Sequence, residues 1–216
     1  LKQSNKEYFI WVSADDKLHP EFLEKNIDIL EKNKNVVCSI GDVIYSDDVN
    51  YEFKSNNETK KTFRQRYVKS TYGTYESKVR TYLKFFQASM MYGLYRRDKL
   101  QKSITINKIF LAFDLTIILN VLKYGDFHVI DENLLHRYNK GSHSIIGTLH
   151  EYDISLINII FLEFPFTFWC LKNLGFKNFV KNFDVFLKIN IRGGLIILLE
   201  TIRISKRIVF RQDMFW

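Results

Sequence analysis

Glycine, proline and cysteine are scarce in this chain of 216 residues, which has 9 Gly, 2 Pro and 2 Cys. So few Gly and Pro exclude a collagen-like repeat and argue against a disordered chain. Cys38 and Cys170 are too far apart in the sequence to indicate a zinc site or a disulfide framework. Both stand among apolar or aromatic residues, so we expect two buried thiols in a protein whose 46% apolar residues can form a core.

The chain has no excess of acidic residues and carries a net charge of +8, which favours an anionic partner. Nucleic acid, an acidic membrane face and a phosphorylated substrate all fit this charge. No RNA- or DNA-binding motif is present, and the aromatic residues stand in apolar runs rather than in basic patches. We therefore expect no nucleic-acid partner.

The first third of the chain predicts an α/β unit. Residues 8–12 form a continuous apolar run, which is typical of a strand buried on both faces of a mostly parallel sheet. A helix is expected to begin after His19-Pro20, with Leu23, Ile27 and Leu30 on its inward face. Residues 36–45 predict the next strand, which completes a βαβ order.

The remaining elements are expected as helices over 77–86 and 114–124 and strands over 90–95, 127–130 and 133–138. The helix over 114–124 has an apolar stripe, and Gly125 is expected to end it. The stripe consists of Leu115, Ile118, Leu119 and Leu122. Because the composition shifts after about residue 150, we expect one domain over 1–148 and a helical region over 149–216.

Asp15 and Asp16 are the first residues that point to chemistry. They follow the predicted strand over 8–12, and the carboxyl ends of strands in α/β sheets are where ligands bind. Carboxylate oxygens suit divalent cations that also contact substrate phosphates. An Asp-Asp pair also occurs by chance in loops, and we interpret Asp47-Asp48 as such a solvated turn.

Residues 8–23 resemble the metal-binding segment of family 2 glycosyltransferases, which is an apolar strand, an Asp-rich turn and a helix beginning near a Pro. The resemblance implies that Asp15 and Asp16 hold Mg²⁺ or Mn²⁺ against the diphosphate of a nucleotide-sugar donor, with Asp16 as the direct ligand. Ser13 stands where the family commonly has an acid.

Asp114 stands at the start of a predicted helix, where a carboxylate is favoured as a simple N-cap. The segment 113–115, followed by a helix that ends at Gly125, is similar to the family's catalytic-base segment. That similarity implies that Asp114 deprotonates the acceptor hydroxyl. Phe113 stands where relatives often have Glu.

Two further segments, 87–97 and 134–144, look like the family's acceptor-side and closing segments. The resemblance assigns substrate binding to Tyr92, Arg96, Arg97 and Arg137. It also gives Asn139 the position of a metal-facing His, as a third ligand. Without the resemblance, Arg96-Arg97 is a solvated helix start, and His136 and His143 are ordinary polar residues.

The resemblance, which covers about residues 1–148, implies a partial GT-A (Rossmann-like) mixed sheet with flanking helices. It implies an inverting glycosyltransferase that uses a nucleotide-sugar donor and a lipid-linked or surface-polysaccharide acceptor. The strands that hold the nucleotide base in the family are missing, so we expect a C-terminal fragment that is inactive alone. The alternative is a degenerate, non-catalytic scaffolding or binding protein at the membrane.

The C-terminal region predicts a membrane contact. Residues 154–176 are long enough to span a bilayer, but Glu163 and Pro165 favour a helix in the interface. From Lys172 onward there are nine Lys/Arg and three acids, a net of +6, which suits anionic lipid. We expect peripheral or monotopic attachment to the cytoplasmic face of the cell membrane. The alternative is a helical subdomain packed on the core or in an oligomer interface.

Overall fold

The computed structural model describes residues 5–46, 48, 51–53, 64–66, 68–85, 88–104, 110, 112–138 and 163–212. The chain forms two compact units, of which the first comprises Leu1–Ile106 with Asp114–Lys140 and the second Asn107–Phe113 with Gly141–Trp216. The predicted domain boundary after residue 148 lies outside the described residues.

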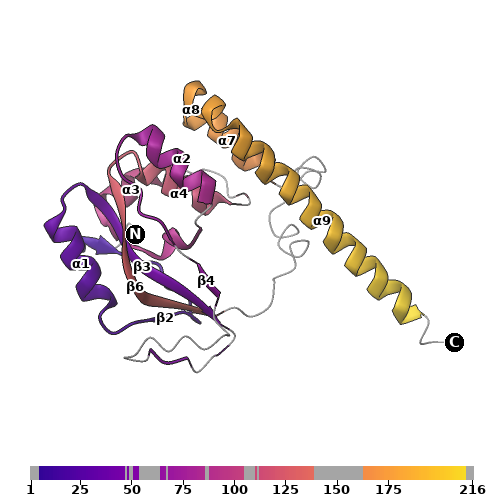
Figure 1. The fold of residues 1–216 in the computed structure, drawn as a ribbon, viewed down its shortest axis with the longest axis horizontal. Coiled ribbons are helices and arrows are strands. Elements are labelled where there is room, and N and C mark those ends of the chain that lie inside the picture. Colours follow the sequence, from indigo (N-terminus) through magenta and orange to yellow (C-terminus); the bar gives the residue numbers. More distant parts are fainter. Residues whose placement is uncertain are drawn as a thin grey trace. The chain divides into compact units, whose positions relative to one another are not determined.

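The first unit contains both helices and strands, and helices alone are described after residue 162 (Figure 1). The elements are, in chain order, β1 (Tyr8–Phe9), β2 (Lys17–Leu18), α1 (Phe22–Lys32), β3 (Val36–Ser46), β4 (Arg64–Arg66), α2 (Tyr75–Phe85), the 3-10 helix η1 (Ala88–Tyr92), β5 (Leu94–Arg96), α3 (Arg97–Ser103), α4 (Phe113–Val121), β6 (Asp126–Tyr138), α7 (Phe164–Asn173), α8 (Phe176–Lys181) and α9 (Phe183–Gln212).

The first unit is built on a mixed sheet with the strand order β1-β5-β3-β6-β2, and β4 pairs with β3 off this path. The central pair, β3 and β6, is parallel, whereas β5, β4 and β2 pair antiparallel to their neighbours. Both β1 and β3 pair antiparallel with β5, so β1 and β3 run in the same direction. The helix α1 lies between them in the sequence. The predicted α/β class, a mixed sheet with flanking helices, is confirmed.

The first strand differs from its prediction. β1 has only two residues, both half-buried, and Val12 is 48% exposed. β1 lies at the end of the strand order and pairs with β5 on one side, so a strand buried on both faces is not formed. Beyond it the chain is held by aromatic contacts, because the ring of Trp11 meets the rings of Phe9 and Tyr95 edge-on at 4.8 and 5.8 Å.

The helix α1 forms as predicted but turns another face inward. Leu30 is buried as expected, whereas Leu23 and Ile27 are exposed. Phe22 and Asn26 take their place, since positions 22, 26 and 30 lie one turn apart on the same face. Asn26 Nδ2 donates to the Phe22 carbonyl at 2.7 Å, and this bond offsets part of the cost of burying an amide.

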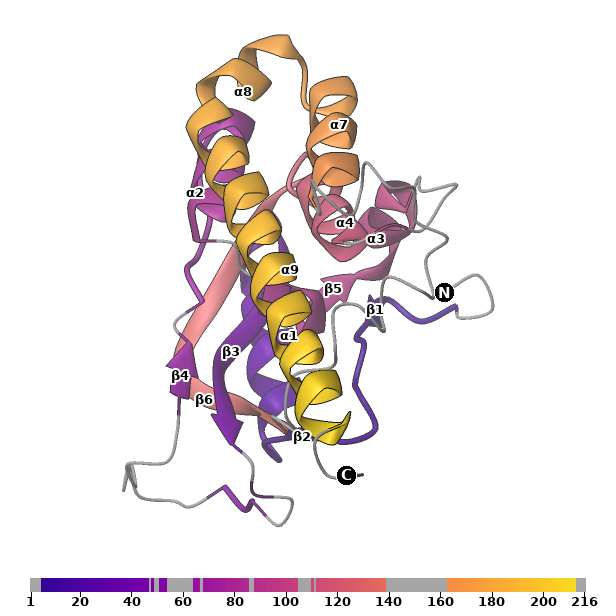
Figure 2. The ribbon, with the colours of Figure 1, turned by 90° about the vertical axis from the view of Figure 1, so that its right-hand side faces the viewer.

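The helix α4 carries the predicted apolar stripe. All residues from Leu115 to Val121 are buried, so the helix is enclosed rather than amphipathic. It lies beside α3 in both ribbon views (Figures 1 and 2), and Asn120 Nδ2 donates to the Ser103 carbonyl at 3.1 Å. The role predicted for Gly125 is wrong: α4 ends at Val121, and Gly125 has no left-handed φ. A Cβ there would lie 2.3 Å from the Asn35 carbonyl oxygen, so glycine permits close approach of the backbone.

The segment predicted as a strand over 90–95 begins as the 3-10 helix η1 and becomes β5 only at Leu94. Gly93 joins the two elements, and a Cβ on it would lie 2.4 Å from Cys38 Sγ. The two segments predicted over 127–130 and 133–138 form one strand, β6, whose register against β3 shifts near Gly41. Both Cys38 and Cys170 are buried and free, as predicted.

The second unit contains α7, α8 and α9. Phe186 of α9 meets Phe166 of α7 at a ring separation of 6.5 Å and stacks on Phe179 of α8 at 4.9 Å. Asn190 Nδ2 also donates to Thr167 Oγ1 at 2.7 Å, which fixes α7 against the start of α9. Among the described helices, none combines the length and apolar character that a bilayer crossing requires. The predicted apolar segment 154–176 is described only from residue 163 onward.

Candidate functional site

The turn after β1 presents the two predicted aspartates differently. Ser13 Oγ donates to Asp15 Oδ1 at 2.7 Å, and the Asp16 N–H donates to the Ser13 carbonyl at 3.2 Å. Asp15 is exposed, whereas the Asp16 side chain is only 1% exposed. The two carboxylates therefore point into different surroundings, and Asp16 alone faces the interior.

The pairing of β2 with β6 places Asp16 beside Arg137. Lys17 is the register partner of His136, so the preceding residue, Asp16, lies beside Arg137. Arg137 Nε lies 3.1 Å from Asp16 Oδ2 and 3.4 Å from Oδ1. Burial raises the pKa of the Asp16 carboxyl, while Arg137 and the Tyr138 backbone N–H lower it. An ion pair thus holds the predicted metal ligand.

The guanidinium of Arg137 also contacts Tyr92 of η1. Nη2 donates to the Tyr92 hydroxyl at 2.9 Å, and the guanidinium carbon lies 3.8 Å from the centre of the Tyr92 ring. Burial raises the pKa of Tyr92, and the adjacent Arg137 lowers it. Stacking of a guanidinium on an aromatic ring stabilises the cation without removing all its donors.

Asp114 lies in the first turn of α4, where it is half-buried. Burial raises the pKa of its carboxyl; the backbone N–H groups of Leu115 and Asp114 and the charge of Arg137 lower it. Just before this turn Ala112 has a φ of 62°, which is uncommon for a residue with a Cβ. Asp114 also acts on the pKa of Tyr92, so it belongs to the same electrostatic environment.

The fold therefore brings three of the predicted site residues into contact, namely Asp16, Tyr92 and Arg137. A fourth, Asp114, lies near enough for its charge to act on the pKa of Tyr92 and for the charge of Arg137 to act on its own. We refer to these four residues as the charge cluster. Asp15 lies next to it in the turn, and Asn139 lies outside the described residues.

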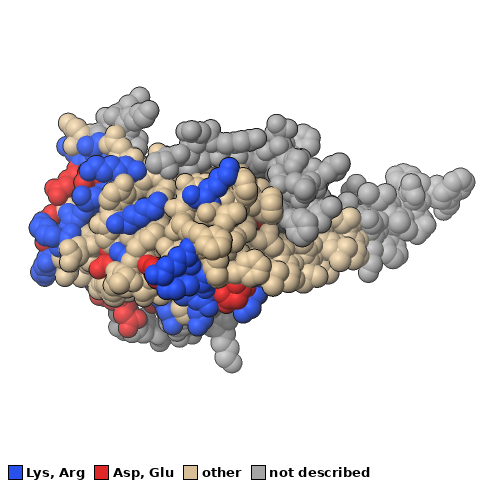
Figure 3. All heavy atoms as spheres, turned by 90° about the horizontal axis from the view of Figure 1, so that it is seen from above, with Lys and Arg blue, Asp and Glu red and all other residues tan. Residues whose placement is uncertain are grey.

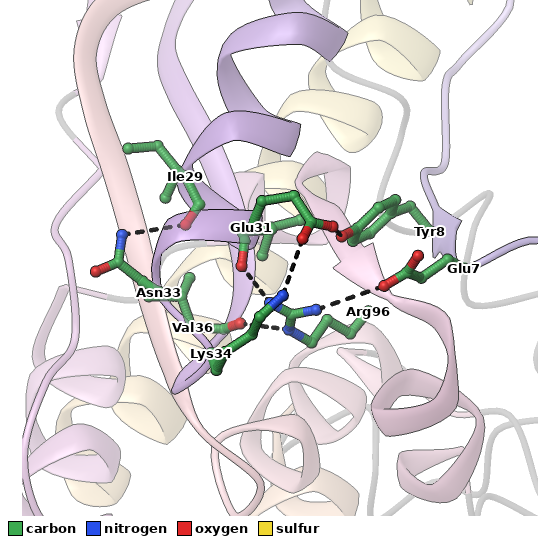
Figure 4. Close-up of polar contacts among 9 residues, drawn as sticks. Glu7, Tyr8, Ile29, Glu31, Asn33, Lys34, Val36 and Arg96 are labelled. Atoms are coloured by element: carbon green, nitrogen blue, oxygen red, sulfur yellow. Dashed lines mark hydrogen bonds and ion pairs between the residues drawn. The ribbon is translucent and has the colours of Figure 1, made fainter.

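Arg96 lies elsewhere, in a different network (Figure 4). Its Nε donates to the Val36 carbonyl at 2.9 Å and its Nη2 donates to the Leu30 carbonyl near the end of α1. Glu7 forms a longer ion pair with it at 3.9 Å. A cation is favoured at a helix C-terminus, so these contacts stabilise α1 and its connection to β3. The predicted contact of Arg96 with a substrate phosphate stays a prediction, and its bonds to the backbone favour a structural role.

The same network holds β1 against α1. The Tyr8 hydroxyl donates to Glu31, which also receives a bond from Lys34 Nζ at 2.9 Å (Figure 4). Burial and the bond to Glu31 raise the pKa of Tyr8 to about 12. Arg97 donates its backbone N–H to the Glu7 carbonyl at 2.9 Å and lies outside the charge cluster. These bonds position the strand that precedes Asp15 and Asp16.

Sequence reasoning missed Tyr45 and Ser89. Tyr45 is the register partner of Arg137 across the parallel pair β3–β6, and the guanidinium lies 5.8 Å from the Tyr45 ring. The Tyr45 hydroxyl and Ser89 Oγ are 2.7 Å apart, and Ser89 belongs to η1, as does Tyr92. The carboxyl end of a predicted parallel strand was the signal that could have identified Tyr45, because ligand sites occur there.

His136 lies next to the cluster but faces away from it. Its ring is buried, its Nε2 lies 2.7 Å from Ser46 Oγ, and the Tyr51 ring stacks on it at 4.1 Å. Burial lowers the pKa of His136, and the nearby Lys17 lowers it further. These contacts agree with the interpretation of His136 as a polar residue without a ligand role.

The donors present fit a divalent cation that shares the phosphates of a substrate. No group of three or more His, Cys, Asp or Glu side chains within the described ranges is close enough to hold a metal by itself. Asp15 and Asp16 nevertheless offer carboxylate oxygens, and Mg²⁺ in proteins is commonly held by one or two carboxylates together with phosphates and water. Arg137 is the group that such a cation would have to displace from Asp16.

Comparison with known families gives the class of protein that this part of the chain resembles. Residues 1–103 match the family described as Glycosyl transferase family 2. The matched part includes Asp15, Asp16 and Tyr92, while Asp114 and Arg137 lie beyond it. No curated protein matches the chain.

Proposed function

We propose that this chain is the catalytic part of an inverting glycosyltransferase that moves a sugar from a nucleotide-sugar to a lipid-linked or surface-glycan acceptor. The observation that supports this most strongly is the charge cluster itself. A half-buried carboxylate, Asp114, shares one environment with a guanidinium, Arg137, that is suited to a diphosphate. The match of residues 1–103 to the family described as Glycosyl transferase family 2 supports the transferase class.

Asp114 serves as the general base in this proposal. A carboxyl whose pKa is raised by burial is a stronger proton acceptor than an exposed one. It takes the proton of the acceptor hydroxyl as that oxygen attacks the anomeric carbon. The bond from this carbon to the diphosphate breaks on the opposite side, which inverts the configuration with a single base and no covalent enzyme intermediate.

Arg137 binds the leaving group, and the two aspartates would hold a cation beside it. Asp15 and Asp16 would hold Mg²⁺ or Mn²⁺, which when bound supplies positive charge to the departing diphosphate. Arg137 binds the same anion with its remaining donors, and Tyr92 keeps the guanidinium plane oriented through the stacking at 3.8 Å. Asn139 is the further proposed ligand.

The helices of the second unit support attachment to the cytoplasmic face of a membrane. Four apolar residues of α9 recur every fourth position and are 51–56% exposed, namely Phe183, Leu187, Ile191 and Leu195. Lys188 and Arg192 alternate with them and are exposed. Figure 3 shows Lys and Arg side chains in blue on the surface of the described residues. Apolar and basic residues combined on one helix suit an anionic lipid interface.

The test is sugar transfer by the full-length protein with Mn²⁺ or Mg²⁺ and a panel of nucleotide-sugars. Asp114→Asn and Asp16→Ala are compared with the wild type and with Asp28→Asn, which removes an exposed acid of α1 paired with Lys32. We expect metal-dependent transfer that Asp114→Asn and Asp16→Ala abolish and Asp28→Asn retains. If no donor reacts, or the site variants match the wild type, a non-catalytic scaffolding protein replaces the transferase.

A further inference from the structure

We propose that Arg137 and the divalent cation compete for Asp16, so that the cation enters only as the guanidinium leaves and becomes available to the diphosphate. The inference rests on the proposed function for the identity of the cation. It adds a regulatory exchange within the site, in which Arg137 occupies the cation's position in the resting protein.

The enclosure of Asp16 is the first observation behind this exchange. Its side chain is 1% exposed, and both carboxylate oxygens lie within 3.4 Å of Arg137 Nε. The Tyr138 backbone N–H supplies a further hydrogen bond. A divalent cation needs direct contact with a carboxylate oxygen at a little over 2 Å, and it repels a guanidinium in the same place. Because Arg137 Nε reaches both oxygens of Asp16, a cation bound to either oxygen meets the guanidinium charge at short range, and the two compete for this carboxylate.

The surroundings of Arg137 give the guanidinium a second position. Its side chain is 23% exposed, so it reaches solvent while Asp16 does not. The rings of Tyr92 and Tyr45 lie 3.8 and 5.8 Å from the guanidinium, and neither contact depends on Asp16. Released from the carboxylate, the guanidinium keeps a cation–π contact and turns its donors outward.

Competition of this kind couples the binding of the divalent cation to the binding of the diphosphate. A cation on Asp16 frees Arg137 for an anion, and an anion on Arg137 frees Asp16 for a cation. By thermodynamic reciprocity each ligand then tightens the other by the same factor. A protein with this arrangement holds metal weakly when no donor is bound.

The experiment measures Mn²⁺ binding to the full-length protein without any nucleotide, by the electron paramagnetic resonance signal of free Mn²⁺. We expect Arg137→Gln to bind Mn²⁺ at least tenfold more tightly than the wild type, because the competing charge is gone. The double variant Arg137→Gln/Asp16→Asn should lose this gain. Lys32→Gln, which removes one positive charge at the end of α1, should stay within twofold of the wild type. Equal or weaker binding by Arg137→Gln, or a gain that survives in the double variant, overturns the exchange.

A second measurement uses the wild type alone and needs no variant that could misfold. The ¹⁵Nε–¹Hε resonance of Arg137 should move when Mg²⁺ is added, whereas that of Arg96, bonded to the Val36 carbonyl, should stay. An unmoved Arg137 resonance at saturating Mg²⁺ contradicts the proposal. Failure of sugar transfer with the Mn²⁺ result intact would reject the proposed function alone, and active transfer with equal Mn²⁺ affinities would reject the exchange alone.

Discussion

His136 Nε2 and Ser46 Oγ lie 2.7 Å apart at the carboxyl end of the parallel pair β3–β6. The other ring nitrogen, Nδ1, is buried and has no hydrogen-bond partner within the described part of the chain. A protonated ring would bury a second N–H without an acceptor, which explains in structural terms why burial lowers the pKa of His136. This ring therefore makes the stability of the first unit depend on pH.

Stability should fall as the pH drops from 7 to 5. The pKa of His136 is lower in the folded state than in the unfolded state, so the unfolded chain binds more protons below an unfolded pKa of about 6.5. Urea unfolding at several pH values measures this slope, which His136→Gln should reduce. His128, whose pKa burial also lowers, contributes in the same direction, so part of the slope remains. An unchanged slope in His136→Gln contradicts the assignment.

Asp114→Asn should stabilise the protein and inactivate it. The raised pKa of Asp114 means that folding disfavours its ionised form, so removal of the charge raises the free energy of unfolding at pH 7. This gain should shrink as the pH falls through the raised folded-state pKa and should be gone below about 4, where the unfolded carboxyl is protonated as well. Loss of a general base lowers kcat by about 10²–10⁴-fold. Thermal unfolding and initial rates on one preparation test both, and a destabilised, active variant would refute this role.

The ion pair between Asp16 and Arg137 should be measurable as a coupling energy. A double-mutant cycle with Asp16→Asn and Arg137→Gln isolates it, and for contacting residues such terms are about 0.5–3 kcal/mol. We expect the upper half of this range, because the carboxylate is almost fully enclosed. Urea unfolding at pH 7 gives the four free energies. A coupling near zero would mean that the pair forms only weakly in solution.

Gly93→Ala should destabilise the protein by about 1–3 kcal/mol. The added Cβ would lie 2.4 Å from Cys38 Sγ, which sits in a closely packed part of the sheet. Cys38→Ala removes that sulfur. The double variant Gly93→Ala/Cys38→Ala should therefore lose less free energy of unfolding than the two single variants lose together. Additive effects would show that the neighbouring Ser39 and Met90 carbonyls, at 3.1 and 3.3 Å from the Cβ position, set the limit instead.

Membrane attachment can be tested on α9. Ile191→Gln with Leu195→Gln removes exposed apolar area, and we expect at least tenfold weaker binding to vesicles that contain anionic lipid. Lys188→Gln with Arg192→Gln should weaken binding at low salt by about 1 kcal/mol per charge and have little effect at high salt. Flotation of the full-length protein measures both. Binding that neither pair of substitutions changes would favour an oligomer interface or a packed subdomain.

Periodicity and residue type were sufficient for much of the fold. The apolar stripe of α4, the strand β3 and the two buried thiols follow from local patterns, because each is enclosed by its own unit. Local patterns could not show which face of α1 is buried. Positions 23, 27 and 30 and positions 22, 26 and 30 both have helical spacing, and only the packing of α1 against the sheet distinguishes them.

The site was predictable to a similar extent. Its position after a predicted strand pointed to Asp16, and the resemblance to family 2 glycosyltransferases pointed to Tyr92, Asp114 and Arg137. Arg96 has the same chemistry as Arg137 but lies where it caps α1, and its neighbours differ only through tertiary structure. Tyr45 was missed because its contact with Arg137 follows from the register of β3 and β6, which requires knowledge of strand order.

The pairing of β2 with β6 has a consequence for the order of folding. Asp16 and Arg137 are 121 positions apart, so every element from α1 to α4 lies within the loop that closes when they meet. Contacts between such distant positions close a large loop, and parallel strand pairing is slow for the same reason. Because β6 also pairs with β3 and with β2, the strand that supplies Arg137 completes the described sheet and the charge cluster together.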